Sequence, residues 1–154
     1  MNLPQFPSSF LGAEAARDSA AEGEQFPVNF YTPDGVVAEG KIDQVVLPGV
    51  EGVFGVKANH VPIIAQLKPG LVELHDGTEV QKFFVSGGFA LVHPNSVTDI
   101  CAVAAAPLEQ FDGAAVKAAL QQAQAAPSGD DFDAAVNRAA TEVFSALDAA
   151  LEAK

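Results

Sequence analysis

Two groups of residues in this chain have types and spacings that could do chemistry. Gly49, Gly52 and Gly55 recur every third residue, and glycine-rich loops can cradle a phosphate. Such a cradle uses the backbone amides at a helix N-terminus, whereas a strand-like pattern follows these glycines. The second group is Val85-Ser86-Gly87-Gly88, in which a serine precedes two glycines. It lacks the glycine two residues before the serine that a nucleophile elbow requires. Neither group therefore predicts a nucleotide site or a catalytic nucleophile.

Histidines and paired carboxylates are the remaining chemical candidates. His60, His75 and His93 could in principle gather around zinc, but each lies in its own predicted turn and none has a metal-ligand spacing. Asp130 and Asp131 stand where they would cap a helix, which accounts for their charge. We therefore expect no catalytic residues, no metal site and no cofactor.

Composition narrows the possible functions further. The chain has 154 residues, 49% of them hydrophobic, and a formal net charge of -12. This length fits one domain with an appendage. The negative charge argues against nucleic-acid binding, and it favours either a basic protein partner or a role in solubility alone. Cys101 is the only cysteine and lies in the apolar run ICAVAAA, so we expect a buried, inert thiol.

Residues 27–106 have the pattern of an antiparallel β-sandwich. Short apolar runs alternate with turn signals, of which Pro33-Asp34-Gly35 and Asp76-Gly77 are the clearest. Gly87-Gly88 between two runs predicts a bulge or bend. In the stretch from Val45 to Leu74, glycine and proline recur so often that a helix is excluded. That stretch indicates a shaped binding surface rather than an active site.

Residues 107–154 change to a helical period. Asp112 is the expected N-cap of a first helix, and Asp130 or Asp131 that of a second. The two helices, joined by a short turn, predict an antiparallel hairpin. In the second helix five apolar residues form one face that is expected to pack within the hairpin: Phe132, Val136, Val143, Leu147 and Leu151.

Residues 1–26 form a third region, with mixed charges and no sustained period. One arginine among several acidic residues does not fit an intact transit peptide, which should be rich in arginine and poor in acidic residues. We expect this region to be an extended tail that lies on partner subunits.

Several blocks resemble the small central-stalk subunit of F-type ATP synthases, called epsilon in bacteria and chloroplasts and delta in mitochondria. The resemblance covers residues 27–154, and the wording NSVTDICAVAAAPLEQFD is similar to mitochondrial delta of plants and green algae. The blocks that carry it are Leu47-Pro48-Gly49, Gly52, Phe54-Gly55, His60, Pro62, Leu67-Lys68-Pro69-Gly70 and Phe83 to Phe89.

The resemblance implies a mainly β protein with added α structure, namely a β-sandwich followed by a helical hairpin. It implies a non-catalytic rotor subunit that links the gamma subunit to the c-ring and couples proton flow to ATP synthesis. Such a subunit is peripheral to the mitochondrial inner membrane on the matrix side, and the small mitochondrial epsilon subunit is a further partner. The implied interface residues are Pro48, Gly49, Val50, Glu51, Gly52 and Val53 toward the c-ring, with His60 and Pro62 near its junction with gamma.

The chain departs from the bacterial pattern at two points. Some bacterial relatives bind ATP through Ile-Asp-x-x-Arg-Ala, and the matching stretch from Phe111 to Val116 lacks the arginine. The last helix also lacks the basic residues of an inhibitory bacterial hairpin. We therefore expect neither ATP sensing nor inhibition by hairpin extension.

Two other classes of function stay open from the residues alone. One is a free-standing β-sandwich adaptor that binds a soluble partner, and the other is an enzyme with a histidine-based zinc site. For the rotor subunit, a Gly52→Trp variant is expected to disturb coupling or assembly while the isolated domain stays folded.

Overall fold

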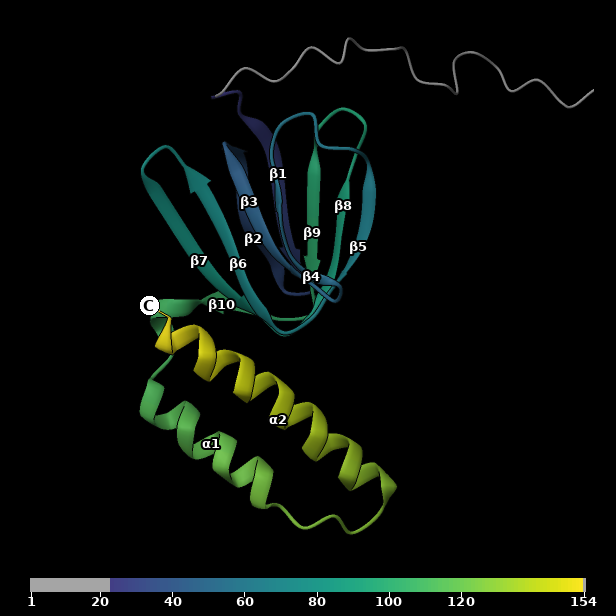
Figure 1. Cartoon of the computed structure of the whole chain (residues 1–154), viewed down its shortest axis with the longest axis vertical. Helices are drawn as coiled ribbons and strands as arrows, with labels where there is room; N and C mark the ends of the chain where they lie inside the picture. Colours follow the sequence, from purple (N-terminus) through teal and green to yellow (C-terminus); the bar gives the residue numbers. More distant parts are fainter. Residues whose placement is uncertain (1–22, 154) are drawn as a thin grey trace, which may run out of the picture.

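The computed structural model describes residues 23–153, which form a β-sandwich above a pair of helices (Figure 1). The tail predicted for residues 1–26 falls outside the described residues except at its end, where Phe26 begins the first strand. The strands are β1 (Phe26–Thr32), β2 (Gly35–Ile42), β3 (Gln44–Gly49), β4 (Gly52–Val56), β5 (Ile63–Leu67), β6 (Gly70–Asp76), β7 (Glu79–Val85), β8 (Gly88–Val92), β9 (Thr98–Ala102) and β10 (Ala105–Pro107). A 3-10 turn, η1 (Leu108–Gln110), leads to the helices α1 (Gly113–Ala125) and α2 (Asp131–Glu152).

The strands form one continuous sheet that folds over itself into two layers. Their order is β10-β7-β6-β3-β5-β8-β9-β1-β2, and β4 pairs with β3 beside this path. This confirms the predicted β-sandwich followed by a helical hairpin. The purely antiparallel pairing was wrong at one place, because β1 and β9 run parallel. These two strands lie far apart in the sequence, so no short turn constrains their relative direction.

Apolar side chains on alternate strand positions fill the space between the two layers. Phe30, Val45, Leu47 and Ile100 are completely buried there. Phe30 meets Phe83 edge to face across the sandwich, with 5.5 Å between ring centroids. Because successive strand residues point to opposite faces, this packing leaves every second residue free to face outward.

Cys101 shows the consequence of this alternation. Its neighbours Ile100 and Ala102 are buried, whereas Cys101 itself is exposed on the outer face of β9. The expected buried thiol was therefore wrong. The apolar run that contains it is a strand, so its residues cannot all face the core.

Glycines allow the sharp bends between the strands. Gly35 and Gly77 have φ of +144° and +59° in the two turns that the sequence predicts. Gly88, in the predicted bend, has φ of +148°, and a Cβ there would overlap the Cys101 carbonyl of the adjacent strand. The backbone of β8 therefore approaches β9 at a distance that only glycine permits.

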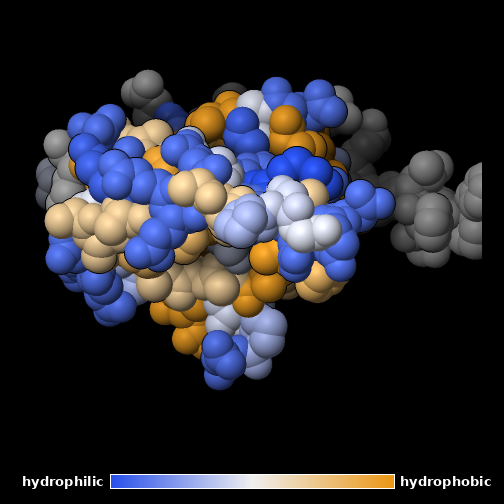
Figure 2. Space-filling model, turned by 90° about the horizontal axis from the view of Figure 1, so that it is seen from below, coloured by the Kyte–Doolittle hydropathy of each residue, from blue (hydrophilic) through white to orange (hydrophobic). Residues whose placement is uncertain are grey.

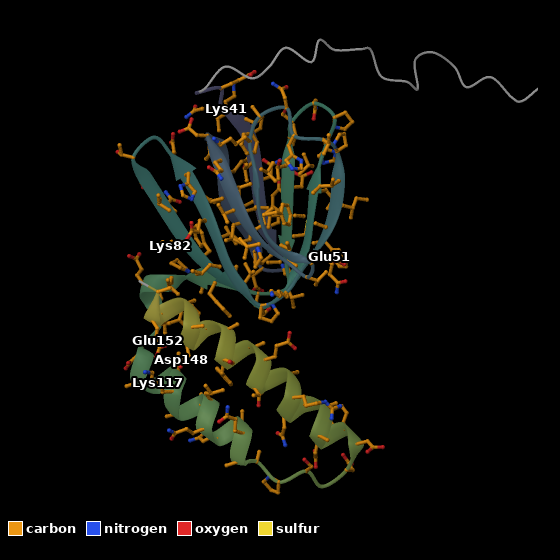
Figure 3. All side chains as sticks on the ribbon, viewed as in Figure 1. Lys41, Glu51, Lys82, Lys117, Asp148 and Glu152 are labelled. Atoms are coloured by element: carbon orange, nitrogen blue, oxygen red, sulfur yellow. The ribbon has the colours of Figure 1, made fainter. Side chains whose placement is uncertain are left out.

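Aspartates cap both helices as predicted. The Asp112 carboxylate accepts a hydrogen bond from the Ala114 amide at 2.9 Å, and the Asp130 carboxylate accepts one from the Asp133 amide at 2.8 Å. Where the start of α1 lies beside the end of α2, Lys117 of α1 donates a hydrogen bond to Glu152 of α2 at 3.1 Å (Figure 3). That hydrogen bond and the Asp148 carboxylate raise the pKa of Lys117.

A second, smaller core joins the hairpin to the sandwich. Phe84 of β7 meets Phe111 edge to face, with 6.0 Å between ring centroids. The buried members of this cluster are Phe84, Leu108, Val116, Leu147 and Ala150. The hairpin is thus held on the outer face of β6 and β7, beside the end of β10.

The apolar face predicted for α2 is only partly packed. Leu147 is buried and Val143 and Leu151 pack on the second core, but Phe132 is 74% exposed and Val136 is also exposed. The first turns of α2 extend beyond the sandwich (Figure 1). Side chains of the sandwich therefore cannot pack on this part of the helix. The expectation that the whole stripe serves hairpin packing was therefore wrong for its N-terminal half.

A Gly88→Ala variant should be strongly destabilised. The new methyl group would have to move the β9 backbone while the residue keeps a positive φ, and together these effects should cost about 3 kcal/mol. Urea unfolding would measure the loss. Gly40→Ala is the matched control, because a Cβ at Gly40 meets nothing within 4 Å. Equal stability of the two variants would contradict the close approach of β8 and β9.

Leu147→Ala should loosen the junction between hairpin and sandwich. Removing a buried leucine side chain typically costs about 2–5 kcal/mol, and the cavity would lie in the second core. Hydrogen exchange should then accelerate in α1 and α2 more than in the sandwich strands. Phe132→Ala serves as the control, since that exposed ring should contribute less than about 0.5 kcal/mol.

Candidate protein interface

The predicted glycine-rich loop is the tight turn between β3 and β4. Gly52 has φ of +137°, and a Cβ at Gly49 would lie 2.8 Å from the Gly52 carbonyl oxygen. The turn is also tied to the strands beside it, because the Val50 amide donates to Gln66 and the Lys68 amide donates to Pro48. These contacts hold the residues at the tip, Val50 and Glu51, on a rigid support.

Apolar side chains are exposed beside this turn. Val53 is 70% exposed and Ile64 of β5 is 77% exposed, and both line one shallow groove with Val50. Aliphatic side chains this exposed, gathered at one place and rigidly held, are typical of a protein contact. Figure 2 shows the molecule from below, with the helical hairpin nearest the viewer and hydrophobic residues among hydrophilic ones on its surface.

The apolar surface continues over the outer face of the neighbouring strands. Phe89 of β8 lies opposite Gln66 of β5 on one side and opposite Cys101 of β9 on the other. Phe89 and Cys101 are both exposed. We refer to Val50, Val53, Ile64, Phe89 and Cys101 together as the apolar strip.

Polar residues border the apolar strip on β9 and β1. Asp99 accepts a hydrogen bond from Asn29 at 2.8 Å, and its other oxygen lies 2.6 Å from His93 Nε2. Tyr31, opposite Cys101, is half-buried, and this burial together with the Glu39 and Asp99 carboxylates raises the pKa of its phenol.

His60 and Pro62 lie at the opposite end of the sandwich from the glycine-rich turn. They belong to the loop that joins β4 to β5, which the Asn59 amide ties to Ser96 at 2.9 Å. Five residues of β5 separate the two loops, a length of about 17 Å. Figure 3 places Glu51 at the lower end of the sandwich. The structure therefore does not gather the eight predicted interface residues at one place.

The three histidines also stay separate. His60 Nδ1 donates to the Val61 carbonyl at 2.7 Å, His75 lies 3.1 Å from Glu73, and His93 pairs with Asp99. Within residues 23–153, no group of three or more His, Cys, Asp or Glu side chains is arranged to hold a metal ion. The helices of this described part are also not long and apolar enough to cross a membrane.

The sequence reasoning did not single out Ile64 and Phe89 as exposed apolar residues, and it expected Cys101 to be buried. The signal that could have found them is the period of two in β5 and β8, where buried and exposed positions alternate. Gln66 is a polar exposed residue of β5, as expected for a solvent-facing strand, but the exposed Ile64 and Phe89 are apolar.

Comparison with known proteins identifies the family. Residues 25–107 match the family described as "ATP synthase, Delta/Epsilon chain, beta-sandwich domain". That match spans more than half of the chain. It contains all of the strands described above and neither of the two helices. The chain therefore belongs to the delta/epsilon chain family of ATP synthase.

Its relatives within that family are mitochondrial delta-type subunits. ATP synthase subunit delta′ of Ipomoea batatas is 38% identical and covers 96% of this chain and 75% of the relative. Subunit delta of Eremothecium gossypii is 44% identical and covers 90% of each chain. A chain in the mitochondrial ATP synthase of Euglena gracilis has a similar structure, with a TM-score of 0.77 at 30% identity over 97% of this chain and 96% of that one.

Cys101 should react readily with a maleimide in the isolated, native protein. Its thiol is on the outer face of β9 and needs no unfolding to be reached. Mass spectrometry would follow the labelling, and the rate in denaturant serves as the reference. Labelling that is more than about a hundredfold slower in the native protein would mean that opening of the structure controls access.

Proposed function

We propose that this chain is a non-catalytic rotor subunit in the central stalk of the mitochondrial ATP synthase, where it links the gamma subunit to the c-ring. Its place is then peripheral, on the matrix side of the inner membrane. The apolar strip is the observation that carries this proposal, since a rigid sandwich with an apolar outer face suits a fixed contact with another subunit. Family membership does not favour the free-standing adaptor or the zinc enzyme.

The glycine-rich turn is the proposed contact with the c-ring. Pro48, Gly49, Val50, Glu51, Gly52 and Val53 make up this turn and its flanks. The turn lies at one end of the sandwich, and its hydrogen bonds to β5 and to the loop between β5 and β6 hold it in place. Glu51 at the tip is the charged group that would select a polar or basic loop of the partner.

The gamma subunit is the proposed partner of the rest of the apolar strip. Ile64, Phe89 and Cys101 lie across three adjacent strands, which makes a broad and flat surface. The strip starts at the glycine-rich turn, and β5 leads from there to the loop of His60 and Pro62, where Val61 is again exposed. One elongated partner along β5 could therefore contact both ends, as the proposed junction of gamma and c-ring requires.

The hairpin offers a separate surface for the small mitochondrial epsilon subunit. Phe132 and Val136 lie one turn apart on α2 and are both exposed. They lie on the part of the helix that the sandwich does not cover. This surface is distinct from the apolar strip, so both partners could bind at once.

Ile64→Asp is the variant that tests the gamma contact. Ile64 is almost fully exposed, so the isolated subunit should stay folded, with a stability change within about 0.5 kcal/mol. A buried, unpaired carboxylate at an interface should lower assembly of the stalk at least about tenfold. Co-purification of gamma and c subunits from mildly solubilised membranes, with ATP synthesis measured in parallel, would quantify the loss.

Val80→Asp is the matched control, because Val80 is an exposed valine on the outer face of β7, away from the apolar strip. Normal assembly and synthesis in Ile64→Asp would count against the proposed contact. The Gly52→Trp variant is less suitable than the sequence indicated. With φ of +137° at Gly52, tryptophan would strain the turn itself.

A further inference from the structure

The sandwich is open along one side. Within residues 23–153, β2 pairs with β1 and with no other strand, so its second edge is unpaired. On the other layer, β10 covers β7 only from Phe83 to Val85, because Pro107 ends the pairing and has no amide to donate. The edge of β7 from Glu79 to Lys82 is therefore also unpaired.

The strands of the two layers diverge at this side of the sandwich (Figure 1). A groove lies between them, lined by residues of β1, β2, β6 and β7. Its floor is apolar and reaches the main core, at Val28, Ile42 and Leu74. Its rim is polar and mostly acidic, with Glu39, Asp76 and Glu79 against Lys41. The inward-facing positions of β7 explain the opening. Phe83 and Val85 fill the core in the C-terminal half of this strand, whereas the inward-facing positions of its N-terminal half hold the polar, exposed residues Glu79 and Gln81.

We propose that this groove binds an extended, basic segment of a partner protein, which adds a strand to the free edge of β2. An exposed strand edge supplies unpaired backbone donors and acceptors, and strand addition is a common mode of peptide recognition. Side chains of an added strand alternate, so one set would meet the apolar floor and the other the acidic rim. Alternating apolar and basic residues therefore define the segment.

This inference rests on the sandwich and not on the assembly proposed above. The groove lies on the side of the molecule formed by β2, β6 and β7, whereas the apolar strip extends over β5, β8 and β9. Lys41 marks the upper end of β2 and Glu51 the glycine-rich turn at the lower end (Figure 3). A segment in the groove would thus leave the apolar strip free.

Gly40 provides the variant that tests the groove. It lines the groove, and a Cβ there meets nothing within 4 Å, so Gly40→Trp should fill the groove without disturbing the fold. Gly113→Trp is the matched control, because Gly113 also has free space and lies at the start of α1, outside the groove. Circular dichroism would confirm that both variants are folded.

The probe is a fluorescent peptide of about seven residues that alternates lysine and valine, which is long enough to pair with most of β2. Fluorescence anisotropy with the full chain should show saturable binding, at least about tenfold weaker for Gly40→Trp and unchanged for Gly113→Trp. Glu79→Lys should also weaken binding, and a peptide with glutamate in place of lysine should bind at least about tenfold more weakly. Amide exchange should slow along β2 in the complex.

Three results would overturn the proposal. The first is no saturable binding of the lysine peptide, and the second is binding that Gly40→Trp leaves unchanged. The third is binding that appears only after residues 1–22 are removed, since the chain's own N-terminal segment would then be the occupant.

Discussion

Two neighbouring phenylalanines on β7 connect the parts of this molecule. Phe83 points into the sandwich and packs on Phe30, whereas Phe84 points outward and packs on Phe111. Each ring therefore belongs to a different core, and β7 connects the two cores. Because the two side chains share a backbone, the hairpin cannot shift on the sandwich without disturbing the packing of β7. The position of the hairpin follows from this constraint.

A rigid sandwich makes its outer face useful for binding. The buried positions of β5 and β8 hold Ile64 and Phe89 outward, so these apolar side chains need little ordering when a partner arrives. The same holds at the glycine-rich turn, which hydrogen bonds tie to the neighbouring strands. For a subunit of a rotating stalk this matters, because torque passes only through contacts that do not yield.

The surfaces of the chain are divided among its parts. The apolar strip runs from the β3–β4 turn and β4 over β5, β8 and β9, the exposed side chains Phe132 and Val136 lie on α2, and the acidic groove lies between β2 and β7. These three surfaces belong to different elements and do not overlap. A small subunit can in this way contact several partners at once, each through chemistry of its own.

The architecture, the turns and the helix caps could be predicted from the amino-acid sequence alone. Gly77, Asp112 and Asp130 act through neighbours a few residues away, so local patterns suffice to predict them. The need for glycine at residue 88 comes instead from the close approach of β9. The resemblance to the delta/epsilon family of ATP synthase also came from short local blocks, such as Leu47-Pro48-Gly49.

Which residues share a surface could not be predicted in this way and became clear from the folded chain. It exposed Cys101, left Phe132 without a partner, and placed His60 at the far end of the sandwich from Gly49. These facts depend on strand direction, on register and on how far the sandwich reaches over α2. All three arise from packing between segments distant in the sequence, which no local pattern encodes.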